Sequence, residues 1–262
     1  MSSVTCLISG ETKTGKTTLG LTFPKPLRHF DLDVGGFRRA KHRFQADIDS
    51  GQVVSKSYFA PQQAVIGRLD VGPSKLLVGM KELWYKMLKD YLEALKDEDV
   101  ATIMFDSWAQ VWELCRSAFL QEKQEFKKER SNLMREEYTE PNARMRAILT
   151  AAVEMDKNLV LTAPMDDEYE KRQGASGEVL DVVIGRKSAG WRHIDPLSDV
   201  NIRNDVRSVS VVDDTGKSAK VLKVYSKFTL CGLALQATGF EMPDATWDSL
   251  RNVIVIFRGS EI

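Results

Sequence analysis

The sequence predicts an α/β fold in which helices cover both faces of a mostly parallel β-sheet. Over residues 1–165, short apolar runs typical of buried strands alternate with segments whose apolar residues have helical spacing. A glycine-containing loop separates the first strand from its helix. Of the 262 residues, 43% are hydrophobic and 28% are charged, which suits a globular chain with a full core. The alternation indicates βαβ units and therefore parallel strand pairing.

The first strand is expected at Val4–Ile8, and the first helix at Thr17–Phe23, because Pro24 ends it. Further strands are expected at 27–32, 52–58, 100–105 and 158–163. Apolar residues at helical spacing predict helices over 76–95, 108–119 and 145–155. We expect a single domain over residues 1–262.

The second half of the chain predicts an antiparallel extension of the sheet. Residues 206–212 and 221–228 alternate in hydrophobicity around the turn Asp213–Lys217, which predicts a β-hairpin over about 206–228. Residues 165–198 contain several glycines and read as loops, and about 116–147 form a charged helical insertion. A short helix near Thr246–Asn252 is expected to precede a strand at Val253–Phe257.

The loop Gly10–Thr17 fits the phosphate-binding pattern G-x-x-x-x-G-K-[ST] at every fixed position. In such a loop, backbone N–H groups and the start of the helix face phosphate oxygens. Lys16 would reach the β- and γ-phosphates, and the Thr17 hydroxyl would bind Mg²⁺. The residues expected at the nucleotide are Gly10, Glu11, Thr12, Lys13, Thr14, Gly15, Lys16, Thr17 and Thr18.

A second carboxylate is needed to hold the Mg²⁺ shell. Asp106 follows the apolar run Thr102–Phe105, so it leaves a buried strand at the edge where parallel sheets bind ligands. We therefore assign Asp106 as the Walker B aspartate. The competing interpretation is that Asp106 only caps the following helix.

Asp31 and Asp33 follow the second expected strand and should share the crevice with Asp106. Either carboxylate is a candidate for orienting the water that attacks the nucleotide. The alternative is turn chemistry, because Asp before Gly35-Gly36 is common in turns.

These motifs together resemble a known family. The phosphate loop lies at the start of the chain, Phe30–Gly36 and Thr102–Ser107 follow, and Asn158–Ala163 comes next. In this order the sequence is similar to the phage RecA-like ATPases called phage nucleotide-binding proteins, which include RecA-like single-strand annealing proteins. The resemblance implies a RecA-like core with a strand inserted between the Walker A and Walker B strands.

The resemblance also implies ATP hydrolysis with Mg²⁺, assembly into a homo-oligomeric ring or filament, and action on single-stranded DNA in phage recombination or replication. A single-strand-binding protein is a further implied partner, and the host bacterial cytoplasm is the implied location. Relatives often carry Glu where Asp33 stands. In RecA-like proteins the loops after the strand at 158–163 face DNA or a neighbouring subunit, so Arg186, Lys187 or Arg192 is a candidate trans-acting finger. The alternative is a mobile surface loop whose acidic residues balance these charges.

Composition limits the partners. Lys plus Arg and Asp plus Glu both number 37, so no global field favours nucleic acid or membranes. The three separated cysteines suit a reducing compartment, and we expect no signal peptide and no membrane span. The densest basic cluster is Arg38–Arg43, where Phe37 and Phe44 would stack bases if the cluster binds DNA; a solvated helix face is the alternative.

Two other functions remain open at this point. A P-loop small-molecule kinase would need an arginine-rich lid, and the chain has Arg-containing loops but no compact lid. A nucleotide-dependent assembly protein with weak hydrolysis is the other alternative. A GTPase is disfavoured because no N-K-x-D motif appears.

Overall fold

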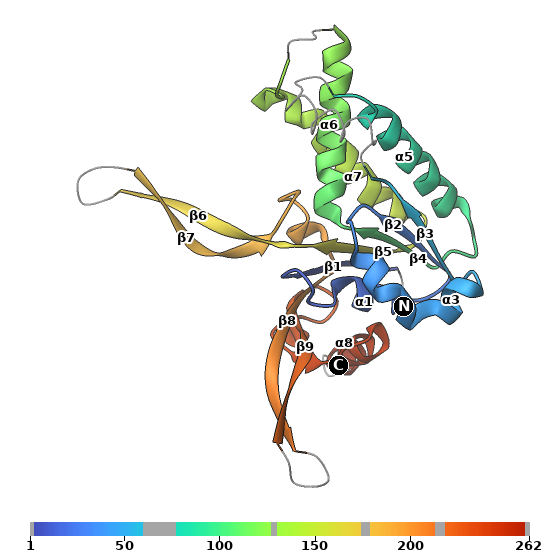
Figure 1. The fold of residues 1–262 in the computed structure, drawn as a ribbon, viewed down its shortest axis with the longest axis vertical. Helices are drawn as coiled ribbons and strands as arrows, with labels where there is room; N and C mark the ends of the chain where they lie inside the picture. The colour runs from blue at the N-terminus through green and yellow to red at the C-terminus, as the bar shows by residue number, and fades with distance from the viewer. Residues whose placement is uncertain (1–2, 60–76, 127–129, 174–178, 213–217, 260–262) are drawn as a thin grey trace.

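The computed structural model describes residues 3–59, 77–126, 130–173, 179–212 and 218–259 (Figure 1). Within these residues one large sheet contains the strands β1 (Thr5–Gly10), β2 (Leu27–Asp31), β3 (Val53–Ser57), β4 (Thr102–Asp106), β5 (Asn158–Ala163), β8 (Val200–Val212), β9 (Ser218–Cys231) and β10 (Glu241–Pro243). Their spatial order is β10-β9-β8-β1-β5-β4-β2-β3.

The pairs from β8 through β1, β5, β4 and β2 to β3 are all parallel, whereas β9 and β10 are antiparallel to their neighbours. The predicted fold class is therefore confirmed: a mostly parallel sheet with helices and an antiparallel extension toward the C-terminus. The strand β5 lies between β1 and β4, which is the inserted strand that the resemblance implies.

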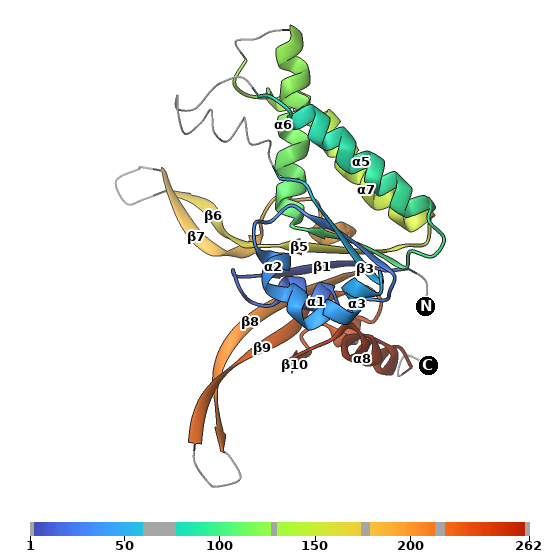
Figure 2. The ribbon, with the colours of Figure 1, turned by 45° about the vertical axis from the view of Figure 1, so that its right-hand side comes forward.

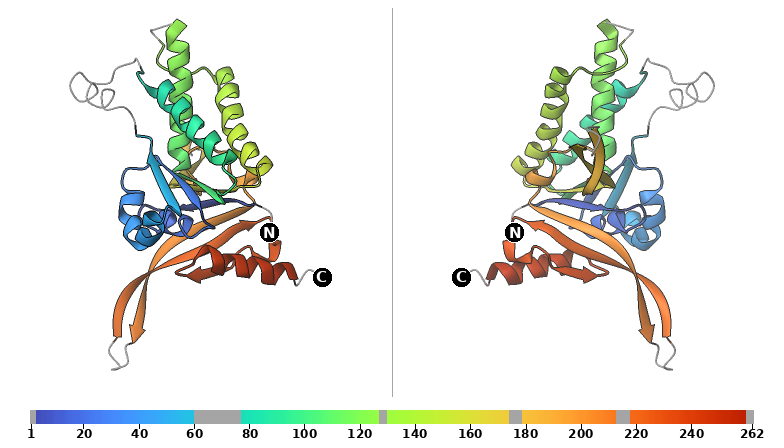
Figure 3. Two further views of the ribbon diagram at one scale, coloured as in Figure 1. Left: turned by 90° about the vertical axis from the view of Figure 1, so that its right-hand side faces the viewer. Right: turned by 90° about the vertical axis from the view of Figure 1, so that its left-hand side faces the viewer.

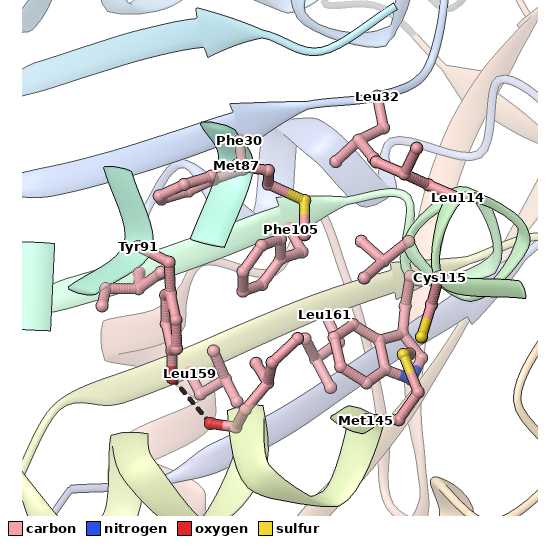
Figure 4. Close-up of a cluster of buried hydrophobic side chains, with 14 of the residues drawn as sticks. Phe30, Leu32, Met87, Tyr91, Phe105, Leu114, Cys115, Met145, Leu159 and Leu161 are labelled. Carbon is pink, nitrogen blue, oxygen red and sulfur yellow. Dashed lines mark hydrogen bonds between the residues drawn. The ribbon is translucent and has the colours of Figure 1, made fainter. Parts of the chain in front are cut away.

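Three helices cover one face of the sheet: α5 (Met80–Lys96), α6 (Trp108–Phe126) and α7 (Thr139–Glu154) (Figures 2 and 3). Their apolar sides pack on β4 and β5 in an aromatic-rich core, where Phe105 lies between Phe30 and Tyr91 (Figure 4). The Tyr91 hydroxyl donates to the backbone oxygen of Ile148 at 2.6 Å, which links α5 to α7.

The opposite face carries α1 (Lys16–Gly20), α2 (Gly36–Ala40), α3 (Gln45–Asp49) and α8 (Trp247–Gly259) (Figure 2). A second core joins α1 and α8 to the sheet, and within it Phe23 stacks on Trp247 with ring centroids 4.1 Å apart. Short 3₁₀ turns lie at Lys41–Phe44, Arg135–Tyr138, Asp195–Leu197 and Leu235–Ala237.

Two β-ribbons project from the body in different directions (Figure 1). One is a separate two-stranded antiparallel sheet of β6 (Met165–Gln173) and β7 (Val179–Ser188). The other is the outer part of the β8–β9 hairpin, whose strands are longer than the expected 206–228. Its turn, residues 213–217, lies outside the described residues.

Two expectations about elements are wrong. Residues 165–188 are mostly strand, not loop, because β6 and β7 pair with each other, and a ribbon open to water on both faces needs no alternating pattern. Residues 253–257 are helical, not a strand. Their β-branched run continues α8, since Trp247, Leu250, Val253 and Ile254 are buried at helical spacing.

The first helix is also shorter than Thr17–Phe23, and turns follow it. Among the described residues, no helix combines the length and apolar character needed to cross a bilayer.

Candidate nucleotide-binding site

The loop between β1 and α1 has a backbone that requires glycine. Gly10 has φ +153°, and a Cβ on it would lie 2.4 Å from the backbone oxygen of Asn204 on β8. Gly15 has φ +77° and precedes the first helical residue, Lys16. The two glycines therefore let the loop pass close to β8 and turn directly into the helix.

The second half of the chain anchors this loop. The buried Asn204 side chain donates from Nδ2 to the backbone oxygen of Thr14 at 3.1 Å. Ser226 on β9 donates to Asn204 Oδ1 at 2.9 Å, which fixes the amide orientation. Thr14 Oγ1 also donates to the Glu11 backbone oxygen at 2.8 Å. Sequence reasoning missed Asn204 and Ser226, because a polar pair about 190 residues from the loop carries no local signal.

Lys16 bends back over the loop. Its Nζ donates to the backbone oxygens of Gly10 at 2.9 Å and Glu11 at 2.7 Å. Burial lowers the pKa of Lys16 below its ordinary value, against the charges of Asp106, Asp33 and Glu11. The ammonium is thus held at the mouth of the loop in a partly desolvated setting, where an anion would gain more from it than in water.

Asp106 lies between two threonines. Thr17 Oγ1 donates to Asp106 Oδ2 at 2.7 Å, and Thr162 Oγ1 at the end of β5 donates to Oδ1. The carboxylate is 2% exposed, so burial opposes its ionisation. The nearby His29 and the two hydroxyl donors outweigh that burial and hold the pKa of Asp106 below its ordinary value. Asp106 is therefore a buried carboxylate kept charged.

His29 on β2 stands behind this carboxylate. Its Nδ1 is 2.8 Å from Ser55 Oγ, and its Nε2 lies 3.7 Å from Asp106 Oδ2, beyond hydrogen-bond range. Nε2 is buried and has no hydrogen-bond partner in the described part of the chain. The contact is consequently electrostatic rather than a formed hydrogen bond.

The structure separates the two aspartates after β2. Backbone N–H groups of Leu32 and Asp33 donate to the Asp106 backbone oxygen at 2.6 and 3.0 Å, so this segment is tied to β4. Asp33 is exposed and lines the pocket beside Lys16. Asp31 is 6% exposed and is not among the lining residues. Asp33 is thus the better placed of the two for contact with a bound ligand.

Burial raises the pKa of Asp31 to about 6, His29 opposes the shift, and the charges of Asp106 and Asp33 add to it. One Asp31 oxygen, Oδ1, is buried and has no hydrogen-bond partner among the described residues. A carboxyl group with a higher pKa in the folded than in the unfolded state destabilises the fold as pH rises. For Asp31 that loss falls between about pH 4, its unfolded value, and about pH 6.

The pocket over the loop has a volume of about 570 Å³. It is lined by Thr12, Lys13, Thr14, Gly15, Lys16, Thr17, Thr18, Asp33, Val34, Gly36, Arg39, Ala40, Arg43, Asp106, Ser107, Gln110, Pro164 and Val224. All the expected loop residues except Gly10 and Glu11 are present. Its size falls in the range of about 300–1,000 Å³ usual for small-molecule sites.

The basic cluster 38–43 is divided by the fold. Arg39 and Arg43 line the nucleotide pocket, and neither forms an ion pair with another described residue. The positive charge of Arg39 adds to the lowering of the Lys16 pKa, so the two cations share one electrostatic environment. Phe37 and Phe44, which would stack bases if the cluster binds DNA, are partly buried and pack against the second core.

Gly36 brings α2 against the centre of the site. A Cβ on Gly36 would lie 2.9 Å from both Asp106 Oδ2 and Thr17 Oγ1, closer than ordinary contact. Because Gly36 has no side chain, its backbone can lie directly over the Thr17 hydroxyl and the Asp106 carboxylate.

The donors at this point suit a hard cation. Thr17 Oγ1 and Asp106 Oδ2 are adjacent oxygens, the type of ligand that Mg²⁺ prefers. No group of three or more His, Cys, Asp or Glu side chains that could hold a metal occurs in the described ranges. Mg²⁺ usually keeps several waters and takes substrate phosphates with only one or two protein ligands, so the pair fits it.

The basic residues after β5 have different surroundings. Arg186 on β7 forms ion pairs with Glu11 of the loop and with Asp167 on β6, the latter at 3.3 Å. Arg192 lines a separate pocket beside α6. Lys187 is exposed on the ribbon. Within one chain, Arg186 thus contacts the phosphate loop, whereas Arg192 does not line the nucleotide pocket.

The loop, the sheet order and the pocket define a P-loop nucleotide-binding protein. A family model described as an AAA domain matches residues 2–226, and the chain belongs to that family. Membership indicates a nucleotide-dependent ATPase of the P-loop class. No curated protein matches the chain at a significant level.

Proposed function

We propose that this protein binds ATP with Mg²⁺ over the loop Gly10–Thr17, hydrolyses it, and couples hydrolysis to single-stranded DNA as a ring or filament in phage recombination or replication. The observation that carries the ATPase proposal is the contact of Thr17 Oγ1 with Asp106 Oδ2 at 2.7 Å beside Lys16. This pair joins the phosphate loop and the strand-end carboxylate, the two motifs that would together hold Mg²⁺ at a bound nucleotide.

Each residue has a distinct role in this proposal. Phosphate oxygens replace the backbone oxygens of Gly10 and Glu11 as partners of Lys16, whose ammonium balances their charge. Thr17 and Asp106 hold Mg²⁺, which when bound neutralises charge on the phosphates. Thr162 and His29 keep the Asp106 carboxylate ionised and oriented.

Asp33 is the residue we assign to water orientation, because it is exposed at the pocket wall and tied through its backbone to Asp106. A general base must lie within reach of the water it deprotonates. Asp31, buried behind the wall, acts on this site through its charge.

The first ribbon supports coupling to a second ligand. Strand β6 begins just after Thr162, which donates to Asp106, and Arg186 on β7 pairs with Glu11. A ligand or subunit that moved the ribbon would therefore act on both the loop and the Walker B carboxylate. Exposed apolar side chains on the two ribbons, Tyr169, Val183, Ile184, Val206 and Leu222, favour association with other chains.

ATP turnover with and without single-stranded DNA, alongside light scattering for mass, tests the proposal. We expect Mg²⁺-dependent turnover that DNA increases, in particles larger than one chain. Unchanged turnover in a strict monomer would overturn the DNA and assembly parts. Absence of any turnover would overturn the ATPase part.

A further inference from the structure

A second pocket lies away from the phosphate loop, where α6 and α7 meet the segment after β7. It has a volume of about 440 Å³. Its lining residues are Trp112, Arg116, Arg135, Tyr138, Asn142, Gly190, Trp191, Arg192 and His193. None of them lines the nucleotide pocket, so the two sites are separate.

The lining has an unusual balance of charge and rings. Among the described residues, three arginines and no carboxylate line the pocket, although Glu113 pairs with Arg116 at 2.6 Å just outside it. Arg135 and Arg192 are exposed and form no ion pair with any other described residue. Two positive charges are thus left for a ligand in a protein whose net charge is zero.

The aromatic wall is partly open. Trp112 and Tyr138 are half-buried, with ring centroids 6.3 Å apart, and the Arg116 guanidinium lies 5.8 Å from the Trp112 ring centroid. The Nε atom of Arg116 is buried without a hydrogen-bond partner in the part of the chain that the structure describes. Bases stack on the faces of aromatic rings and on guanidinium planes, and Trp112, Tyr138 and Arg116 bring both kinds of group to this pocket.

Specific contacts hold the floor of the pocket in place. Trp191 is 1% exposed, and its Nε1 donates to Asn142 Oδ1 at 2.7 Å. The preceding Gly190 has φ +97°, and a Cβ there would lie 2.6 Å from the Cα of Ala109 on α6. The segment that carries Arg192 is consequently locked against α6 and holds its position before any ligand arrives.

We propose that this pocket binds a nucleotide unit, with its base against Trp112 and Tyr138 and its phosphate between Arg135 and Arg192. The unit belongs either to single-stranded DNA or to a free mononucleotide, since both present a base and a phosphate. In the DNA case the inference rests on the proposed function and gives it a location. Helix α6 would couple this pocket to the ATPase site, because Gln110 on α6 lines the nucleotide pocket and Trp112 on the same helix lines this one.

Tryptophan fluorescence provides a direct test. Of the five tryptophans, Trp84, Trp108, Trp191 and Trp247 are buried, and Trp112 alone is partly exposed. We would titrate the full chain with oligothymidylate and, separately, with dTMP, while excess ADP occupies the phosphate loop. Stacking on Trp112 should quench its emission, and Trp112→Phe should abolish the quench.

Affinity is tested by a double variant with a matched control. Arg135→Ala with Arg192→Ala should weaken binding about tenfold or more, as expected for lost phosphate contacts. Arg251→Ala with Arg258→Ala removes the same charge from exposed positions on α8 and should leave binding unchanged. Quenching by oligothymidylate alone assigns the pocket to DNA, and quenching by dTMP as well extends it to free nucleotides.

Two results would overturn the inference. One is the absence of quenching by either ligand. The other is binding that both double variants retain equally. If DNA still stimulates ATP turnover in the Arg135→Ala, Arg192→Ala variant, the proposed function stands and this pocket is not its DNA site.

Discussion

Replacement of Gly36 by alanine probes the centre of the nucleotide site with one methyl group. The added Cβ would lie 2.9 Å from both Thr17 Oγ1 and Asp106 Oδ2, where ordinary contact begins at 3.4 Å. The two oxygens must therefore move by about 0.5 Å, whereas Mg²⁺ requires near-ideal octahedral geometry. Gly36 does not have a positive φ, so the backbone itself accepts alanine.

Overpacking of this kind costs about 1–3 kcal/mol. If that cost falls on the bound state, Gly36→Ala lowers turnover about 5-fold to about 150-fold, at about 1.36 kcal/mol per tenfold. The assay is ATP turnover as a function of Mg²⁺ concentration, with circular dichroism to check the fold. Gly259→Ala is the matched control, since a Cβ there meets no atom of the described residues within 4 Å. Wild-type turnover and Mg²⁺ dependence in Gly36→Ala would refute the reasoning.

Three further substitutions test the surrounding residues. Because the pKa of Asp31 is raised to about 6, Asp31→Asn should raise the unfolding free energy by up to about 3 kcal/mol at pH 7.5 and leave it unchanged near pH 4. Urea denaturation at the two pH values measures this, and an equal effect at both would contradict it. Asp33→Asn should lower kcat about 100-fold or more with little change in ATP affinity, and an unchanged kcat would remove Asp33 from the reaction. Arg39→Ala should weaken ATP binding about tenfold by calorimetry, whereas its neighbour Arg38, which does not line the pocket, should tolerate alanine; equal effects would show that only net charge matters.

The sequence predicted those parts of the fold that local chemistry determines. Gly10, Gly15 and Lys16 identify the loop because each is required by the backbone or the charge at its own position. An acid at the end of an apolar run predicts the exit of a buried strand, and Asp106 lies at the end of β4. Both signals are contained within a few neighbouring residues.

Side-chain direction in irregular segments could not be predicted in the same way. Arg39 and Arg43 look like any basic cluster in sequence, and only the path of α2 and of the 3₁₀ turn after it brings them to the pocket. Asn204 reaches Thr14 across 190 positions of sequence. The arginine and tryptophan pocket likewise joins α6, α7 and residues 190–193, none of which carries a motif.

The two errors in secondary structure have opposite causes. None of the described side chains on β6 and β7 is buried, so the ribbon lacks the hydrophobic alternation that predicts strands. The run Val253–Phe257 has strand-forming residues, but packing of Leu250 and Ile254 into the second core keeps it helical. Pairing of the two strands with each other thus decided the ribbon, and packing against the core decided α8.

Release of phosphate from ATP by the wild-type chain and by Lys16→Ala tests the central claim most directly. Lys16 begins α1 and donates to the Gly10 and Glu11 backbone oxygens, so its ammonium stands where phosphate charge would be received. We predict Mg²⁺-dependent phosphate release by the wild type and none above background by Lys16→Ala, with unchanged circular dichroism. Near-wild-type release by a folded Lys16→Ala variant would contradict the assignment of Gly10–Thr17 as the phosphate loop.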